Sequence, residues 1–415
     1  MLINYIKIAW KVLLRHPFYT FITLFGITLT LTVLMLLTSF LDHLIGSHYP
    51  ETKRDRTLYI ERMMQSDSSK NSMSSGPMSF KFLTDYAKTL KTAEHVTIFS
   101  YFNGSNAYVG SQKIKLNITF SDADFWQVAD FNFIEGKPFN EQNIANGDYV
   151  AVITDRFKKH YFPNSEEPVV GKNIVIENIN YKVIGVVKGS PITRPFTHAD
   201  VYFPYTTPKS NYQSTGFRGN YIAMVLAKNA ADVKAVQNEF QGNISRIPLP
   251  GVQDGFTYNV LEVRSELYLD NFIMTVLNGG PGLRTILYGV IGFIVLMLMG
   301  LPAINLVNLN VGRILERASE IGVRKAFGAP VRTLMWQFIV ENIFITFIGG
   351  AIALITTFLL ILMINNSGWI AYADLTINFK VFSVSIIVCL LFGLLSGVLP
   401  ALRMSRLSII DALKA

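Results

Sequence analysis

Four stretches of this sequence are apolar over a length that can cross a lipid bilayer. They run over residues 17–42, 283–312, 334–364 and 379–402. About 20 helical residues cross the hydrocarbon core, so each stretch is long enough to span it. The charged fraction of 16% is well below the roughly 25% typical of soluble domains. We therefore expect an integral membrane protein with four transmembrane helices.

The first stretch could also be read as a signal peptide. It carries no charged residue between Pro17 and Leu41, and the segment Asp42-His43-Leu44 that follows has no small-residue cleavage site. A secretory signal has a shorter apolar region and ends in such a site. The first stretch is therefore predicted to be a retained membrane anchor.

Positive charge is distributed unevenly between the segments that connect the spans. Residues 1–16 predict an amphipathic helix, with Lys7, Lys11 and Arg15 at intervals of four. The loop 313–333 holds five Arg or Lys residues, and the tail 403–415 holds three. The loop 365–378 has none. Because positive loops stay in the cytoplasm, both termini and 313–333 are predicted inside, and 43–282 and 365–378 outside.

The region 43–282 is long enough for a folded domain of mixed α+β class. Hydrophobic periodicity predicts two strand–helix–strand units. The first combines strand 57–63, helix 79–90 and strand 96–102, and the second combines strand 221–227, helix 231–247 and strand 257–263. The sequence thus predicts two βαβ-like lobes, with an insertion over about 103–219.

The insertion is predicted to be rich in strands. Residues 113–120 alternate in polarity, 173–188 resembles a hairpin that turns near Glu177 and Asn178, and 201–205 is another strand. Short helices are expected at 123–130 and 155–161.

This sequence lacks the motifs of several nucleotide-binding, metal-binding and hydrolytic sites. It contains no GxxxxGK[ST] phosphate-binding loop, no HExxH and no GxSxG. The single cysteine, Cys389, excludes a disulfide framework or a thiolate metal site. A metal site at His43 and His48, near Glu51 and Asp55, is an alternative to a solvated segment, but we expect no metal, no cofactor and no enzymatic activity in this chain. The basic residues cluster at membrane edges, so no nucleic-acid binding is expected.

The loop between the second and third spans carries the most informative pattern. Glu316, Glu320 and Arg324 recur at intervals of four, which predicts a short charged helix that ends near Gly328 and Pro330. An ordinary positive loop is one interpretation. The other is a coupling helix that docks on a cytosolic motor protein and inserts apolar residues into it. The candidate coupling residues are Glu316, Arg317, Glu320, Ile321, Gly322, Arg324, Lys325, Phe327 and Gly328.

This loop resembles that of the MacB/FtsX-type permeases of ABC transporters. Asn305 and Asn308 precede it as in that family, and Glu320 to Ala329 follows the family's Glu-Ile-Gly-x-Arg pattern. The third span matches the pattern Phe-x-x-Glu and later Gly-Gly at Gly349 and Gly350. Further matches are Pro400–Leu413 at the end, and Glu135–Phe139, Val150–Thr154, Gly171-Lys172 and Val183–Val187 in the outer domain.

The resemblance implies the permease subunit of an ABC transporter in a bacterial inner membrane. Members of the family bind a cytosolic ATPase subunit, which holds ATP and Mg²⁺, and they work as homodimers or paired half-permeases. Their spans transmit ATP-driven motion to the periplasmic domain, which is called mechanotransmission. A periplasmic adaptor or an outer-membrane channel is a further implied partner of an exporter. The alternative is a non-transporting FtsX-like regulator that activates a cell-wall hydrolase or a sensor.

Four residues within the spans are candidates for helix packing or dimer contacts. Asn305 and Asn308 are polar groups in an apolar stretch and seek partners on neighbouring helices. Gly349 and Gly350 belong to the pattern of the third span. Within the second span, residues 283–310 are about 42 Å long as a helix, which exceeds the ~30 Å hydrocarbon core, so part of the span is expected to project toward the outer domain.

Overall fold

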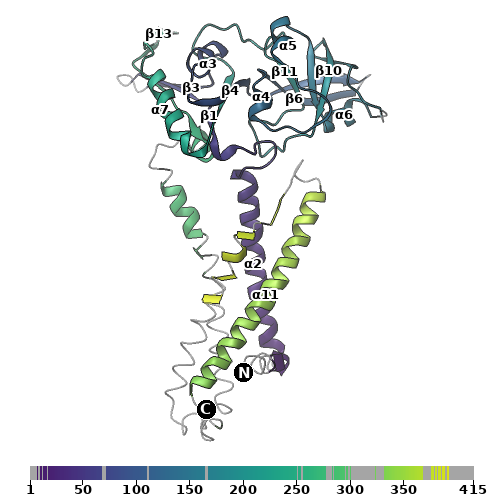
Figure 1. Cartoon of the computed structure of the whole chain (residues 1–415), viewed down its shortest axis with the longest axis vertical. Helices are drawn as coiled ribbons and strands as arrows, with labels where there is room; N and C mark the ends of the chain where they lie inside the picture. The colour runs from purple at the N-terminus through teal and green to yellow at the C-terminus, as the bar shows by residue number, and fades with distance from the viewer. Residues whose placement is uncertain are drawn as a thin grey trace. The chain divides into compact units, whose positions relative to one another are not determined.

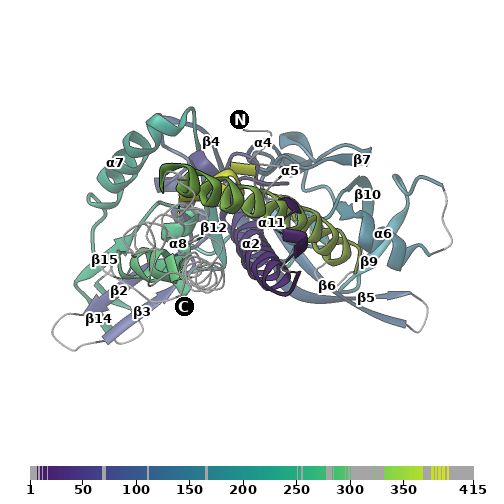
Figure 2. The same cartoon turned by 90° about the horizontal axis from the view of Figure 1, so that it is seen from below.

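The computed structural model combines long apolar helices with a β-rich domain (Figures 1 and 2). The predicted coupling loop lies almost entirely outside the described residues. The residues described are 7, 10, 11, 13–15, 17–67, 72–109, 112–163, 167–249, 251–253, 256–276, 283, 285–294, 296–297, 300, 323, 331–367, 375–377, 379–380, 382–384, 386–387 and 390–391.

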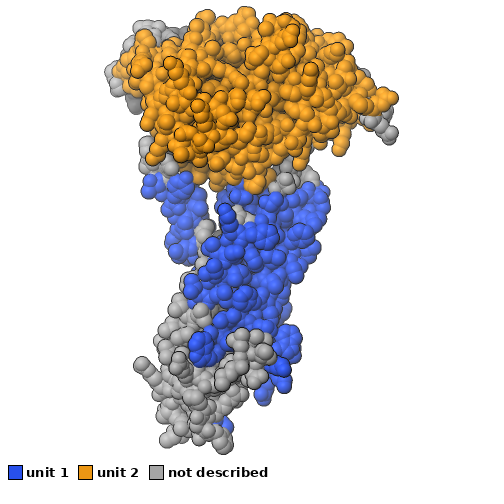
Figure 3. Space-filling model, viewed as in Figure 1, with its two compact units in different colours: residues 1–42, 285–369, 374–415 blue, residues 43–284, 370–373 orange. Residues whose placement is uncertain are grey.

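The chain divides into two compact units (Figure 3). The helical unit takes in residues 1–42, 285–369 and 374–415, and the β-rich unit takes in residues 43–284 and 370–373.

The helical unit is built on helices α2 (Pro17–Ile45) and α11 (Val331–Ser367). Each contains a segment long and apolar enough to cross a membrane, Thr20–Ile45 and Ile339–Ser367. The two helices lie side by side in both views (Figures 1 and 2), and their contact buries Ile27 with Ile345. Two of the four predicted spans are thus described over their length.

The other two predicted spans are described only in part. Within 283–312, an apolar helix runs over Thr285–Ile294. The described residues of 379–402 are helical. The rest of both spans, and the tail 403–415, lie outside the described residues.

The predicted amphipathic segment at the N-terminus packs on the two long helices. Its described residues are helical. Leu13 is buried in the core between α2 and α11, and the Trp10 ring lies 6.2 Å from the Phe344 ring in an edge-on contact. Part of its apolar side therefore contacts protein.

The first lobe of the β-rich unit is an antiparallel sheet whose strands lie in the order β4-β12-β1-β16. Helices α3 and α7 pack against one face of it. This is a split β-α-β arrangement. Its elements are β1 (Thr57–Ile60), α3 (Phe80–Tyr86), β4 (Ala93–Ser100), β12 (Tyr221–Ala227), α7 (Val233–Ile244) and β16 (Glu266–Leu267).

The first predicted strand–helix–strand unit forms as β1, α3 and β4, and the second forms only in part. Its predicted third strand, 257–263, is divided between β14 (Phe256–Tyr258) and β15 (Val260–Val263), which lie outside the main sheet. The prediction that the two units make two lobes is wrong. Strand β12 of the second unit lies between β1 and β4 of the first, with Thr57 opposite Leu226 and Phe99 opposite Ile222. All seven residues of β12 are buried. Two separate lobes would leave an open edge on this fully apolar strand, whereas the interleaved order covers both of its edges.

Side chains alternate between two cores in this sheet, as the period of a strand requires. Ala223 and Val225 of β12 point to the core beneath α3 and α7. Ile222 and Met224 point to the other face, where they join an aromatic cluster around Phe125 and Trp126. Burial on both faces explains why this strand has no polar residue.

The insertion forms the second lobe, which is a closed barrel of six strands. Five neighbouring pairs follow the order β11-β8-β10-β9-β5-β6, and a parallel pairing of β6 with β11 closes the ring. Apolar side chains such as Ile118, Val183 and Phe203 fill the interior. The strands are β5 (Asn103–Val109), β6 (Gln112–Ser121), β8 (Val150–Thr154), β9 (Asn173–Ile176), β10 (Ile179–Val187) and β11 (Val201–Pro204).

The predictions for the insertion are confirmed in their main points. The hairpin at 173–188 turns at Glu177 and Asn178, whose positive φ angles of 51° and 66° match a two-residue type I′ turn. The helix predicted at 155–161 is α6 (Asp155–Tyr161), and the one at 123–130 is the shorter α4 (Phe125–Val128).

The remaining elements complete the β-rich unit. A small sheet has the order β15-β2-β3, and β13 pairs with β14. The bounds are η1 (Arg54–Arg56), β2 (Met63–Asp67), β3 (Ser72–Gly76), β7 (Phe133–Gly136), α5 (Glu141–Asn146), η2 (Ala230–Asp232), β13 (Gly251–Gln253), β14 (Phe256–Tyr258), β15 (Val260–Val263) and α8 (Tyr268–Val276).

Candidate functional site

Most of the sequence-predicted site residues lie outside the described part of the chain. This holds for Asn305, Asn308 and all nine coupling residues, namely Glu316, Arg317, Glu320, Ile321, Gly322, Arg324, Lys325, Phe327 and Gly328. Their roles therefore stay predictions. Gly349 and Gly350 are described.

Gly349 and Gly350 lie on α11 where neighbouring side chains approach the backbone most closely. A Cβ atom at Gly349 would lie 2.7 Å from Cγ2 of Ile27 in α2, and one at Gly350 would lie 2.5 Å from Cδ1 of Ile386. The Thr28 hydroxyl donates to the Gly349 carbonyl over 3.3 Å. Small residues permit this approach between helices in lipid.

The end of helix α2 is bonded to the β-rich unit, to which residues 43–45 already belong. Arg194 Nη2 donates to the carbonyls of His43 and Gly46 over 3.0 and 2.9 Å. Arg54 Nη1 donates to the Leu44 carbonyl over 2.5 Å. The last carbonyls of a helix have no partner inside it and carry a partial negative charge, so both guanidinium groups satisfy and neutralise them.

A single carboxylate, Glu51, connects Arg54 with Tyr59 of the first lobe and with Thr197, which lies three residues beyond Arg194 in the chain. It accepts hydrogen bonds from Arg54 Nε, the Tyr59 hydroxyl and the Thr197 hydroxyl, at 2.8, 2.9 and 2.9 Å. All of these side chains are less than 5% exposed, and Arg194 is fully buried. We call Glu51, Arg54, Tyr59, Arg194 and Thr197 the exit cluster, because the chain leaves α2 beside them.

The exit cluster holds two positive charges against one negative charge. Burial and the neighbouring Arg54 lower the pKa of Arg194 to about 10, while Glu51 opposes that shift. Burial would also lower the pKa of Arg54, but Glu51, together with Tyr59 and Tyr268, acts in the opposite direction and the pKa is raised. The partial negative charge of the α2 end supplies the remaining compensation.

Burial has the opposite effect on the tyrosine of the cluster, since a phenol is charged only when it loses its proton. Burial and the Glu51 carboxylate raise the pKa of Tyr59 well above its usual value. Tyr59 is therefore a neutral donor to Glu51.

Helix α8, which precedes the second predicted span in the sequence, is bonded to the same lobe. The guanidinium of Arg54 stacks 3.5 Å from the ring centre of Tyr268, the first residue of α8. Further along α8, Asn271 and Thr275 donate to the carboxylate of Glu61, which also accepts from Tyr101 of the sheet lobe. The chain segment leaving α2 and the segment approaching the second span are thus bonded to one sheet.

The exit cluster was not predicted from the sequence. Glu51 was noted there only as a neighbour of the histidine pair His43 and His48. The structure buries His43 and places its Nε2 atom 3.2 Å from the Thr193 hydroxyl. In the described part of the chain, no three His, Cys, Asp or Glu side chains gather closely enough to hold a metal ion. The one available signal was the spacing of Glu51 and Arg54, three residues apart just after a span.

Chemically, this arrangement binds and positions backbone. Each polar group of Glu51 is used in a hydrogen bond to protein. The exit cluster therefore has the properties of a rigid joint at the end of a helix.

Comparisons with known proteins match the chain over most of its length. Residues 20–243 match the family described as the MacB-like periplasmic core domain. Residues 289–409 match the family described as the FtsX-like permease C-terminal domain. The first match alone covers more than half of the chain.

Curated relatives include the macrolide export ATP-binding/permease protein MacB of Shewanella sp. strain ANA-3. It is 26% identical over 343 residues, which are 79% of this chain and 48% of that protein. The protein of the same name from Mannheimia succiniciproducens is 26% identical over 322 residues, or 77% of this chain and 46% of that protein. The chain thus spans about half the length of the curated relatives it matches.

Among solved structures, the periplasmic region of MacB from Actinobacillus actinomycetemcomitans aligns with a TM-score of 0.37 at 16% sequence identity. The alignment covers 54% of this chain and 94% of that one.

Proposed function

Because the chain belongs to the family of ABC transporter permeases with a MacB-like periplasmic core domain and an FtsX-like permease domain, we propose that it is a permease subunit of mechanotransmission type. In this proposal a separate cytosolic ATPase subunit binds ATP and Mg²⁺. The spans carry its motion to the core domain, which moves a substrate for export or extraction.

The observation that carries the proposal is the bonding of the α2 end in the exit cluster. Three backbone carbonyls at the end of α2, those of His43, Leu44 and Gly46, accept hydrogen bonds from two buried arginines. Hydrogen bonds to charged groups contribute about 1.5–3 kcal/mol each, and breaking a buried ion pair costs about 3–5 kcal/mol. A displacement of the α2 end is therefore opposed unless the core domain moves with it.

The Glu61 contacts with α8 support the same function at the segment that leads to the second predicted span. Asn271 and Thr275 hold α8 against the sheet lobe, and α8 leads in the sequence to the second predicted span. Two chain segments that enter the predicted membrane region are thus fixed to one sheet. A domain that had only to bind a ligand would not need both.

The loop 313–333 would dock on the ATPase subunit at the cytoplasmic side. Glu320 and Arg324 would form ion pairs with the ATPase subunit, and Ile321 and Phe327 would insert into an apolar groove on it. In this proposal both termini are cytoplasmic, the core domain is periplasmic, and two copies or two half-permeases form the working unit in the inner membrane.

We propose export and not regulation because of the names that the curated relatives carry. The two named above are called macrolide export proteins, and their names join an ATP-binding part to a permease part. The segments matched here are a core domain and a permease domain. We therefore propose that the ATP-binding part resides on another subunit.

The test is co-purification of the full chain with candidate ABC ATPase subunits, followed by measurement of ATP turnover in lipid nanodiscs. We expect a stable complex whose assembly is lost in the charge reversals Glu320→Lys and Arg324→Glu. Lys81→Glu, an exposed position on α3, is the matched control and should leave binding unchanged. Unaltered binding and turnover in both loop variants would refute the docking role of the loop.

A second measurement separates export from regulation. Deleting the gene should raise sensitivity to an exported compound such as a macrolide. A cell-wall defect without such sensitivity would favour an FtsX-like regulator.

A further inference from the structure

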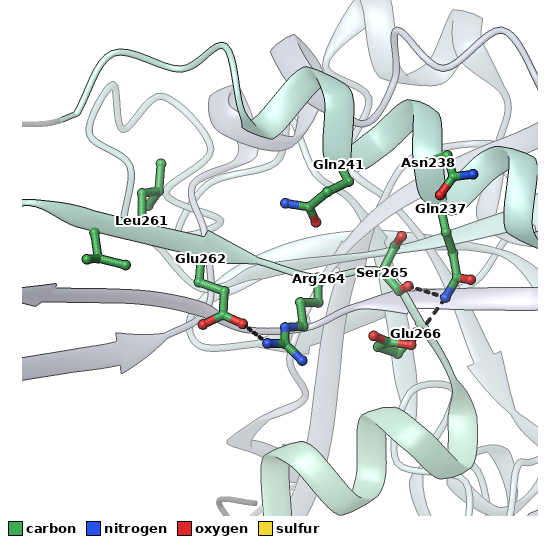
Figure 4. A pocket seen from close by; sticks show the side chains of 9 residues that line it. Gln237, Asn238, Gln241, Leu261, Glu262, Arg264, Ser265 and Glu266 are labelled. Carbon is green, nitrogen blue, oxygen red and sulfur yellow. Dashed lines mark hydrogen bonds and ion pairs between the residues drawn. The ribbon is translucent and has the colours of Figure 1, made fainter. Parts of the chain in front are cut away.

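A groove of about 630 Å³ lies on the β-rich unit between helix α7 and strands β15 and β16 (Figure 4). One wall is formed by side chains of α7, which run along the groove in Figure 4. The opposite wall is formed by residues on both sides of Val263, which is itself buried in the core. The lining residues are Gln237, Asn238 and Gln241 of α7, and Val260, Leu261, Glu262, Arg264, Ser265 and Glu266.

The groove follows the open edge of a strand. Strand β15 pairs with β2, from Val260 opposite Ser66 to Val263 opposite Met63, and no other described strand pairs with it. A groove over the face of a sheet would contact every second residue, because side chains alternate between faces. Here Val260, Leu261 and Glu262 line it in succession, so it runs along the edge, where backbone N–H and C=O groups are unpaired.

Helix α7 already hydrogen-bonds backbone across this groove. The amide of Gln237 donates to the Ser265 carbonyl over 2.8 Å, and also to the Glu266 carboxylate over 3.2 Å. Gln241 lies one helical turn further along, on the same face of α7. Within the described residues its side-chain amide makes no hydrogen bond, so it offers both a donor and an acceptor to an occupant.

The charges of the groove are compensated only in part. Arg264 forms an ion pair with Glu262, and Glu266 accepts from the neutral amide of Gln237. The groove therefore presents the donors and acceptors that a polypeptide backbone uses, together with one excess negative charge from the two glutamates and one arginine of its lining.

We propose that this groove binds an extended segment of a partner protein, which adds as a further strand to the open edge of β15. Edge-strand addition of this kind gains affinity from main-chain hydrogen bonds, and nearby side chains provide specificity. Gln241 bonds the backbone of the added segment in the way that Gln237 bonds Ser265. This interaction goes beyond the proposed coupling function and does not depend on the ATPase.

A second copy of the chain is a less suitable occupant than a partner segment. The four residues of β15 span only about 13 Å, and a stable protein interface buries more than about 1,000 Å² in total. An extended segment of similar length fits the edge without needing such an area around it.

The test uses the full chain in nanodiscs and a fluorescent synthetic peptide of alternating Thr and Val with Lys at both ends. A second peptide is identical but is N-methylated on two successive central residues, which blocks both of its edges. We expect the first peptide to bind about tenfold more tightly, because methylation removes a backbone hydrogen bond from whichever edge pairs with β15 and places a methyl group against that strand. Its binding should slow amide hydrogen exchange at residues 260–266.

A matched pair of variants locates the site. Gln241→Ala should weaken binding several-fold, since one side-chain contact is lost. Lys234→Ala, an exposed position of α7 that does not line the groove, should leave binding unchanged. Unchanged exchange in β12 confirms that both variants are folded.

Three outcomes would overturn the proposal. One is equal binding, or no binding, by the two peptides. Another is exchange at 260–266 that the peptide does not alter. The third is protection of 260–266 without peptide that rises with protein concentration, because that would place a second copy of the chain in the groove.

Discussion

Glu51 has an importance for this fold that its position in the sequence does not reveal. A buried carboxylate is favourable only when its partners compensate the loss of hydration. Here Arg54, Tyr59 and Thr197 all donate to it. Removing the charge leaves two buried guanidinium groups with only the end of α2 as compensation.

We therefore predict that Glu51→Gln lowers the free energy of unfolding by about 3–5 kcal/mol at neutral pH. Denaturant titration of the full chain in detergent measures it. The control is Asp85→Asn, which breaks an exposed pair with Lys81 on α3 and should cost less than about 0.5 kcal/mol. Equal losses in the two variants would contradict the role given to the exit cluster.

Glu61 gives a prediction about pH. Burial raises its pKa above the ordinary value of 4.5, and hydrogen bonds from Asn271 and Thr275 oppose that shift. The folded chain therefore keeps this proton to a higher pH than the unfolded chain. The stabilising contribution of protonated Glu61 is complete below about pH 4.5 and is lost as pH rises through the folded pKa.

The measurement is the difference in melting temperature between the wild type and Glu61→Gln from pH 4 to pH 8. The wild type should lose stability relative to the variant as pH rises, because the variant has no proton to release. A difference that stays constant over this range would show that the Glu61 pKa is not raised.

At the scale of elements, the sequence predicted local structure well and long-range pairing poorly. Helix α6 and the hairpin at 173–188 followed from periodicity and turn residues, which are local properties. The insertion of β12 between β1 and β4 did not, because hydrophobic alternation marks a strand without naming its neighbours. The same limit applies to Arg194, whose bond to the His43 carbonyl joins residues 151 positions apart.

The contact of α2 with α11 supplies a prediction at this scale. Gly349→Ala should destabilise the chain by about 1–3 kcal/mol, since the new methyl group would meet Cγ2 of Ile27, a branched side chain with little freedom. Gly350→Ala should cost less, because it meets the flexible end of Ile386. Thermal unfolding in detergent compares them.

The control is Gly292→Ala, where nothing lies within 4 Å of the added methyl group. This change should be neutral or slightly stabilising, since alanine favours a helix. If all three variants behave alike, close packing at Gly349 is not what holds α2 and α11 together.

At the scale of the whole molecule, the structure departs further from the sequence-based prediction in the candidate site than in the fold. The sequence placed function in the loop 313–333, where charge spacing and a family resemblance are visible. The structure adds a joint in the β-rich unit, built from Glu51 and Arg54, which are three residues apart, and from Arg194, which is distant in the sequence. No local pattern shows such a joint, because its members meet only after the sheet has formed.

We propose that ATP binding to a cytosolic subunit alters the core domain. Hydrogen exchange of the full chain, in complex with a hydrolysis-deficient ATPase subunit and with or without ATP, tests it directly. We predict that exchange rates at residues 43–60 and 260–276 change by about tenfold on ATP binding, the size of a typical coupling between sites. Identical exchange throughout residues 43–276, with ATP bound to the ATPase, would contradict it.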